Sequence, residues 1–106
     1  MKPAAFAYLA PKTLADAVAM LAEVQDDGKV LAGGQSLVPA MNFRLARPGT
    51  LVDLNGVAEL AGVTGDSATG ISIGALTRHA TFHKPPFDGP LAELMAKGVR
   101  NIAHYP

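Results

Sequence analysis

KVLAGGQSLVPAMNF, residues 29–43, is the stretch that decides the fold. It begins with an apolar run short enough for a buried strand, passes through two adjacent glycines, and leaves through Ser36 into an apolar segment that can start a helix. Gly33 and Gly34 have no Cβ, so they can adopt positive φ and let another molecule approach the main chain closely. The stretch therefore predicts a strand, a bare turn and a helix start.

The turn in this stretch has the features of an anion-binding site. Successive free N–H groups ahead of a helix N-terminus form a concavity that suits phosphate oxygens. If Ser36 is the N-cap, Pro39 is the third helical residue and offers no N–H for the Ser36 hydroxyl to cap. That hydroxyl is then available to the second helical amide or to a ligand oxygen. The alternative interpretation of the two glycines is a tight strand-to-helix connection without a ligand.

The glycine turn does not match the common phosphate-binding or nucleophile motifs. It lacks the third glycine of G-x-G-x-x-G and the Gly-Lys-Ser/Thr of a P-loop. Val38 stands where the nucleophile elbow G-x-S-x-G needs glycine. The sequence assembles no nucleophile beside a base, no carboxylate pair and no closed metal site, so any chemistry must come from a bound group.

Length and composition narrow the possible functions. The chain has 106 residues, 49% hydrophobic and 17% charged, which indicates one globular domain at most. Nine basic and nine acidic residues cancel, so no net positive charge attracts nucleic acid or an anionic membrane. The absence of cysteine excludes disulfides and an iron–sulfur cluster held by this chain alone. No apolar run reaches the roughly 20 residues of a membrane span and no signal-peptide pattern is present, so a cytoplasmic location is expected.

The first part of the chain predicts a β-α-β unit. Residues 6–9 predict a short strand, and Thr13 is an expected N-cap with an acidic residue three positions later. Residues 26–28 end this helix, and residues 29–32 form the next strand. A right-handed crossover would make the two strands parallel neighbours. The apolar residues that share one face of the predicted helix are Leu14, Val18, Leu21 and Ala22.

The later elements are predicted to be shorter. Residues 37–45 predict one or two helical turns, because Pro39 interrupts them, and residues 50–54 predict a third strand. Residues 62–65 and 70–74 predict an antiparallel hairpin. Two short helical segments are expected, a turn around 57–60 and a segment over 77–82. A longer helix is expected to begin with Pro90 at its first position and to end at Gly98, with Leu91, Leu94 and Met95 on one side.

Other chemistry-bearing residues favour structural roles. His79 and His83 have the spacing of two metal ligands, but no third ligand accompanies them, so a solvated pair is expected. Arg44 and Arg47 could meet a phosphate or a partner's carboxylate, with solvent exposure as the alternative. Strand ends or helix caps account for the acidic residues Asp16, Asp53 and Glu59.

Residues 32–39, AGGQSLVP, resemble the FAD-binding medium subunit of the molybdenum hydroxylases. This family includes the carbon monoxide dehydrogenase medium chain and the flavin domain of xanthine dehydrogenase. The likeness covers essentially the whole chain. The other stretches that carry it are FAY at 6–8, PKT at 11–13, RLARP at 44–48, LVDL at 51–54 and IGALT at 73–77.

The resemblance implies an α+β fold and an FAD site. It implies a PCMH-type FAD-binding domain, with residues 1–56 as an α/β-type subdomain and 57–106 as an incomplete second subdomain. Main-chain amides of residues 32–36 would hold the flavin's pyrophosphate, with a leucine on each side. The implied cofactor-binding residues are Leu31, Ala32, Gly33, Gly34, Gln35, Ser36 and Leu37, with no catalytic residue and no metal ligand.

The resemblance also implies partners. The family's flavin subunit takes electrons from an iron–sulfur small subunit, which is fed by a molybdopterin large subunit, and passes them to an external acceptor. The family carries a second glycine motif, Thr-x-Gly-Gly-Asn/Ser, soon after the point that matches residues 105–106, and this sequence stops before it. An inactive N-terminal fragment that binds FAD weakly or not at all is therefore expected.

Two functions outside this family remain open. One is a cofactor-free binding module that keeps the fold and associates with itself or with a partner. The other is a small phosphate-binding enzyme, which would need a catalytic group that the sequence does not offer. Exposed apolar residues such as Ile102 and Tyr105 would favour a homo-oligomer or aggregation.

Overall fold

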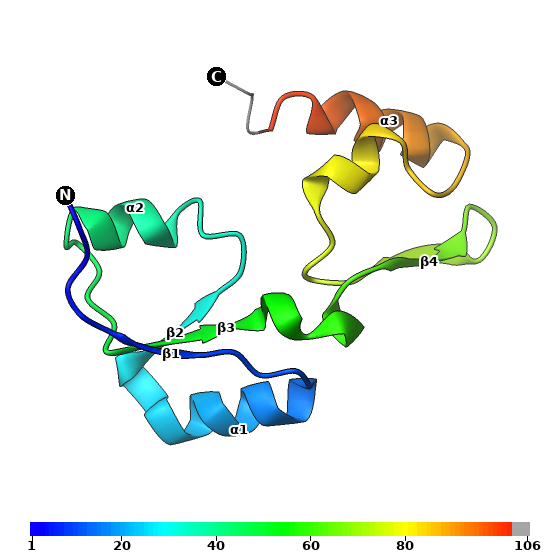
Figure 1. The fold of residues 1–106 in the computed structure, drawn as a ribbon. Helices are drawn as coiled ribbons and strands as arrows, with labels where there is room; N and C mark the ends of the chain where they lie inside the picture. The colour runs from blue at the N-terminus through cyan, green and yellow to red at the C-terminus, as the bar shows by residue number, and fades with distance from the viewer. Residues whose placement is uncertain (103–106) are drawn as a thin grey trace. The chain divides into compact units, whose positions relative to one another are not determined.

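The computed structural model describes residues 1–102 (Figure 1). The chain forms two compact units, the first spanning Met1–Glu59 and the second beginning at Leu60. Both units contain helical turns and strands, which confirms the predicted α+β fold. The assignment of 1–56 and 57–106 as two subdomains of one FAD-binding domain stays a prediction. No helix in the described part of the chain is long and apolar enough to cross a membrane.

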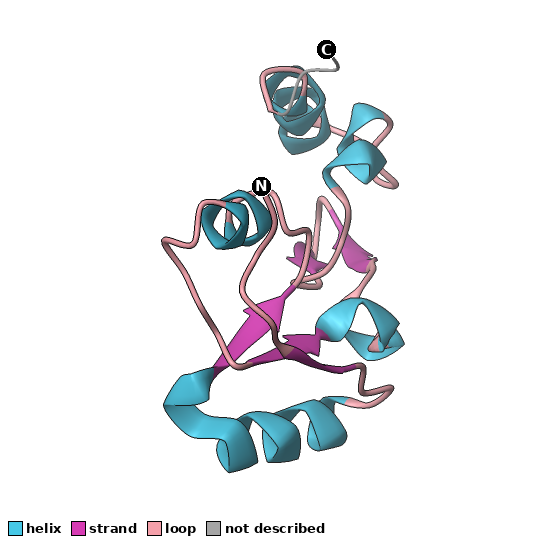
Figure 2. Cartoon of the chain, turned by 60° about the vertical axis from the view of Figure 1, so that its left-hand side comes forward, coloured by secondary structure: helices cyan, strands magenta, loops and turns pink. Residues whose placement is uncertain are grey.

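A parallel sheet forms the centre of the first unit. Its strands are β1 (Ala7–Leu9), β2 (Gly28–Leu31) and β3 (Thr50–Asp53), in the order β1-β3-β2. Figures 1 and 2 show α1 (Leu14–Val24) on one face of this sheet and α2 (Leu37–Asn42) on the other. The parallel strands all end at the edge of the sheet where the glycine turn begins.

The prediction that the first two strands are neighbours is wrong. β3 pairs in parallel with both of them, so that Leu51 lies opposite Tyr8 on one side and Lys29 on the other. A β-α-β crossover leaves room for a third strand between its two strands. β3 occupies this place because its first three residues are buried, and a strand covered on both faces is most stable at the centre of a parallel sheet.

Helix α1 presents a different face to the core than its large apolar residues predict. Ala17 is buried, and Leu21 and Val24 on the same face are half-buried. Val18 is 58% exposed, so the predicted apolar face is rotated from the packed one. A small residue such as Ala17 lets the helix axis lie close to the sheet, while larger side chains remain at the rim or outside.

Thr13 caps α1 as predicted. Its hydroxyl accepts a hydrogen bond from the Asp16 N–H at 3.1 Å, and the Glu59 carboxylate accepts one from the Leu14 N–H at 2.6 Å. The predicted Thr13 cap and a capping role for Glu59 are therefore confirmed for α1.

Removing the Thr13 cap is expected to lower the free energy of unfolding. Thr13→Ala should cost about 0.5–2 kcal/mol, because the Asp16 N–H loses its partner. Ser36→Ala is the matched control, since Ser36 is the N-cap of α2 but makes no side-chain cap bond. Urea unfolding followed by circular dichroism measures both. Equal losses for the two variants would contradict this explanation.

The second unit begins with the predicted hairpin. Strands β4 (Val63–Asp66) and β5 (Gly70–Ile73) pair antiparallel. The Asp66 carboxylate closes their turn by accepting from the Ala68 N–H at 2.9 Å and from the Thr69 N–H at 2.8 Å. Gly65 and Gly70 have φ of 88° and 97°, a region that favours glycine.

Two helical segments follow the hairpin. Helix α3 (Pro90–Val99) begins with proline at its first position, as predicted. The helical segment expected over 77–82 is a 3-10 helix, η4 (His79–His83), which begins two residues later than expected. The Thr77 side chain lies outside it and bonds both the N–H and the carbonyl of Gly62, at 2.9 and 3.0 Å. As in α1, a small residue, Ala92, is buried on α3, while Leu94 is 66% exposed.

Candidate functional site

The loop after β2 leads from the carboxyl edge of the sheet into α2. Gly34 has a φ of 79°, as its predicted role requires, and its carbonyl accepts from the Val38 N–H at 2.9 Å. A Cβ on Gly33 would lie 2.2 Å from the Gln35 Oε1 atom, so the missing side chain leaves room for Gln35 to fold back. Gly34 is therefore required by the backbone conformation, whereas a side chain at position 33 would need only the flexible Gln35 side chain to move.

Four successive N–H groups of this loop face no acceptor among residues 1–102. Within the described residues, the main-chain N–H groups of Gly33, Gly34, Gln35 and Ser36 donate no hydrogen bond. Gly34 is half-buried and the other three residues are exposed. Exposed N–H groups in a glycine turn are the donors that bind phosphate oxygens in proteins.

Ser36 occupies the N-cap position of α2, as predicted, and its side chain makes no cap bond. Pro39 at the third helical position explains this, because it has no N–H to be capped. The hydroxyl is exposed and can donate to a ligand oxygen. Leu31 and Leu37, at the two ends of the loop, are both half-buried.

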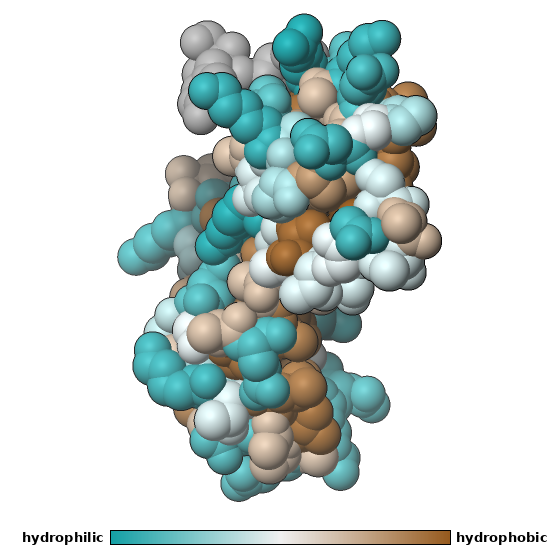
Figure 3. Space-filling view, turned by 90° about the vertical axis from the view of Figure 1, so that its right-hand side faces the viewer, coloured by the Kyte–Doolittle hydropathy of each residue, from teal (hydrophilic) through white to brown (hydrophobic). Residues whose placement is uncertain are grey.

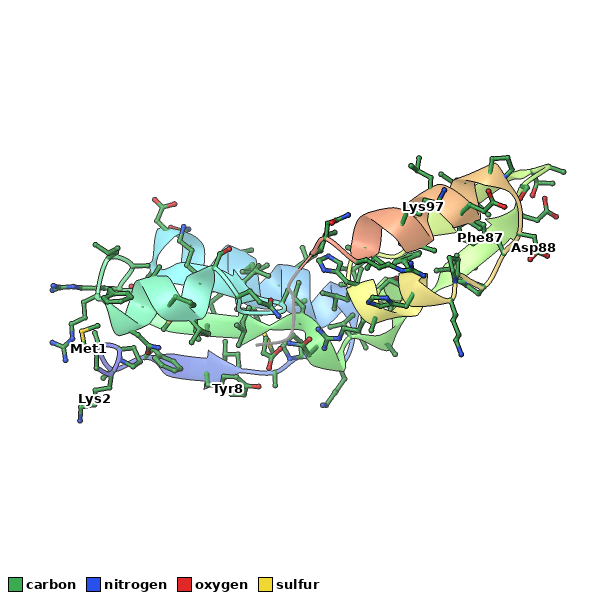
Figure 4. The ribbon with its side chains drawn as sticks, turned by 90° about the horizontal axis from the view of Figure 1, so that it is seen from above. Met1, Lys2, Tyr8, Phe87, Asp88 and Lys97 are labelled. Atoms are coloured by element: carbon green, nitrogen blue, oxygen red, sulfur yellow. The ribbon has the colours of Figure 1, made fainter. Side chains whose placement is uncertain are left out.

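A hydrogen-bonded group that the sequence did not reveal lies beside this loop. The Asn55 Nδ2 atom donates to the Ala32 carbonyl at 2.8 Å and to the Asp53 Oδ1 atom at 2.6 Å. The Tyr8 hydroxyl donates to the other carboxylate oxygen of Asp53. Figure 4 shows Tyr8 on β1. The residues come from three separate segments, and the one local signal was the Asp53-x-Asn55 spacing at a strand end, which is typical of an Asx turn.

This group shifts two pKa values in opposite directions. Burial raises the pKa of Asp53, but the hydrogen bonds from Tyr8 and Asn55 and the charge of Lys12 outweigh it and hold the pKa below its usual value. The hydrogen bond to Asp53, assisted by burial and by the Asp53 charge, raises the pKa of Tyr8. Asp53 is therefore an ionised acceptor and Tyr8 a neutral donor near neutral pH.

The pKa of Asp53 predicts an acid-sensitive contribution to stability. Its value in the unfolded chain is close to the usual 3.8, and the folded value is lower. The contribution is thus complete above the unfolded value and is lost as the pH falls through the folded one. Urea unfolding at about pH 5 and about pH 3 should show a smaller loss of stability for Asp53→Asn than for the natural chain. An unchanged loss would contradict this assignment.

The remaining candidate residues do not join the glycine turn. His79 and His83 are exposed on η4, and no group of three metal-binding side chains occurs among the residues described. The Arg44 side chain donates to the Lys2 carbonyl at 3.4 Å and that of Arg47 to the Arg44 carbonyl at 3.1 Å. Both arginines are exposed, and each donates to a main-chain carbonyl outside the glycine turn.

The chain is similar to known proteins along nearly its whole length. Residues 4–105 match the family described as the FAD binding domain in molybdopterin dehydrogenase. The chain is 51% identical over 104 residues to the 6-hydroxypseudooxynicotine dehydrogenase complex subunit alpha of Paenarthrobacter nicotinovorans, covering 98% of this chain and 35% of that protein. It is 39% identical over 103 residues to the carbon monoxide dehydrogenase medium chain of Hydrogenophaga pseudoflava, covering 97% and 36%.

A solved structure shows the same fold. The chain is similar to reconstituted CO dehydrogenase from Oligotropha carboxidovorans, with a TM-score of 0.86 and 38% sequence identity over 98% of this chain and 36% of that chain. The chain thus spans about a third of the length of the proteins that it matches. With the family model covering nearly all of its residues, this chain belongs to the FAD-binding domains of the molybdopterin dehydrogenases.

Proposed function

We propose that this chain supplies the diphosphate-binding loop of the FAD-binding subunit of a molybdopterin-dependent dehydrogenase. The observation that carries the proposal is the row of four N–H groups, residues 33–36, that face no acceptor among the described residues. The pyrophosphate of FAD offers several charged oxygens to such donors, and hydrogen bonds to a charged oxygen are about twice as strong as neutral ones. Helix α2 has only six residues, so the free amides matter more than its dipole.

Each residue of the loop has a defined part in this proposal. The amides of Ala32 to Ser36 hold the pyrophosphate, and the free Ser36 hydroxyl donates to one of its oxygens. Leu31 and Leu37 flank the loop and shield one side of it from water. When bound, FAD supplies the ability to take up and release electrons; the residues of this chain bind and orient it.

The proposal extends to an electron route. In the complete complex, electrons pass from an iron–sulfur small subunit, fed by a molybdopterin large subunit, through the flavin to an external acceptor. The names of the relatives describe medium chains and subunits of dehydrogenases, which supports a place in a complex of several subunits. In this proposal the chain has no activity alone, because its part is to bind the flavin and the electrons come from the other subunits.

The test is an NMR titration of the chain with three ligands. FAD and ADP carry the pyrophosphate, whereas riboflavin lacks it. FAD and ADP should shift the amide resonances of residues 33–36, and riboflavin should not. Binding should be too weak to survive gel filtration. The assignment is overturned if only other residues shift, or if no amide shifts at the highest ligand concentration that solubility allows. Flavin that co-purifies at near one molecule per chain would contradict the expected weak binding.

A cofactor-free module that associates with a second copy is the other candidate. Large apolar side chains on the surface favour it, and Figure 3 shows brown apolar patches among the polar side chains on the face drawn there. Sedimentation in the absence of flavin distinguishes the two, because a stable monomer argues against the module. Apart from the terminal Met1, the most exposed of these side chains are Leu45, Leu94, Phe43, Val18 and Tyr8. Ile102 is also exposed, while Tyr105 lies outside the described residues.

A further inference from the structure

The peptide unit at the start of the glycine turn is held by a side chain from another segment. The Ala32 carbonyl accepts a hydrogen bond from the Asn55 Nδ2 atom at 2.8 Å. The peptide bond between Ala32 and Gly33 is trans, so its carbonyl and its N–H point in opposite directions. The bond that fixes the Ala32 carbonyl therefore also aims the Gly33 N–H away from Asn55.

Asn55 is held in turn by the end of β3. The Asp53 Oδ1 atom accepts from the Asn55 N–H at 2.9 Å and from its Nδ2 atom at 2.6 Å. The two Nδ2 hydrogens thus have separate acceptors, one on Asp53 and one on Ala32. The Tyr8 hydroxyl fixes the other side of the Asp53 carboxylate, so the arrangement is anchored to two strands of the sheet.

The loop needs such an anchor because of its composition. Two adjacent glycines have more accessible backbone conformations than any other pair, and Gly33 to Ser36 make no main-chain N–H bond to the described residues. Without a contact from another segment, the loop would have to become ordered when the ligand binds, and this loss of conformational freedom would lower the affinity. Donors that are already oriented bind more tightly, because less conformational freedom is lost on binding.

We infer that Asn55 is a positioning residue for the diphosphate-binding loop, oriented by Asp53 and Tyr8. The inference rests on the proposed function, since it assigns Asn55 to the same ligand. Asn55 does not touch the ligand in this account. It acts by setting the direction in which the first free N–H of the loop points.

Asn55→Asp tests the inference with little change of shape. An aspartate accepts hydrogen bonds but does not donate them, so it cannot hold the Ala32 carbonyl. Asn101→Asp is the matched control, because the Asn101 side chain also donates to a main-chain carbonyl, that of Lys97 at 3.3 Å, but lies in the second unit. Asn55→Ala is the second variant, which removes the donor without adding charge.

The readouts are the amide NMR spectrum and a titration with inorganic pyrophosphate. Without ligand, both Asn55 variants should move the Gly33 amide resonance, and Asn101→Asp should leave it in place. With pyrophosphate, both Asn55 variants should bind roughly three- to ten-fold more weakly than the natural chain, which corresponds to one neutral hydrogen bond. Tyr8→Phe should weaken binding less, because it acts through Asp53.

The outcomes separate this inference from the proposed function. If the natural chain binds pyrophosphate at residues 33–36 and the Asn55 variants bind it equally well, the inference is overturned and the proposed function stands. An unmoved Gly33 resonance in both variants overturns it in the same way. If pyrophosphate affects no amide of the loop even in the natural chain, the proposed function falls and takes the inference with it.

Discussion

Leu51→Ala is expected to lower the free energy of unfolding by about 2–5 kcal/mol. Leu51 is 3% exposed and lies on β3, the strand that pairs with both neighbours in the sheet. Removing its side chain forfeits apolar burial and leaves a cavity that the paired strands cannot easily close. Because small domains are stable by only about 5–15 kcal/mol, this single change should remove a large part of the total.

Leu45→Ala is the matched control for this experiment. It is the same substitution at a leucine that is 84% exposed, and surface changes of this kind usually stay within about 0.5 kcal/mol. Urea unfolding of the natural chain and of both variants gives the comparison. If Leu45→Ala cost as much as Leu51→Ala, the buried centre of the first unit would not be at β3.

Gly34→Ala should impair both stability and ligand binding. With a φ of 79°, an alanine in this position should cost about 1–2 kcal/mol, and its Cβ would come 3.1 Å from the Val38 side chain. Relief of this strain rotates the peptide unit that carries the Gln35 N–H, so a donor of the loop is misdirected. Pyrophosphate binding should then weaken by about ten-fold or more, which is the cost of roughly one charge-assisted hydrogen bond.

Gly98→Ala is the control for this substitution. Gly98 lies in α3 and a Cβ there meets no atom within 4 Å, so alanine should stabilise the helix by about 0.5–1 kcal/mol. Pyrophosphate titration followed by NMR and urea unfolding cover both variants. If the Gly34→Ala variant binds pyrophosphate as tightly as the natural chain does, the loop does not need a glycine with positive φ at this position.

The elements of this fold were largely predictable, because their signals are local. The Thr13 cap, the proline at the start of α3, the hairpin and the strands of the sheet each depend on residues a few positions apart. The glycine turn was found in the same way, and its conformation at Gly34 agrees with the prediction. The functional role of its residues stays a prediction.

Strand order and helix orientation were not predictable from local signals. The sequence marks β3 as a strand but does not say that it lies between the other two. The packed face of α1 contains Ala17, and that of α3 contains Ala92 beside Val99. The small size of the two alanines matters only against a neighbouring element. A prediction that follows the largest apolar residues therefore places Val18 and Leu94 inside, where the structure exposes them.

The contact between Tyr8 and Asp53 shows the same limit at the candidate site. These residues lie 45 positions apart and meet because both strands run in parallel to the same edge of the sheet. Asn55 could be recognised as part of a turn, but its bond to the Ala32 carbonyl depends on β2 lying beside β3. Both hydrogen bonds depend on the strand order, so they could not be predicted without it.

The most direct test is a crystal structure of this chain with FAD bound at saturating concentration. The account predicts pyrophosphate oxygens within about 3 Å of at least two of the main-chain nitrogens of residues 33–36. It is contradicted if those nitrogens bond to the protein itself while the pyrophosphate lies elsewhere.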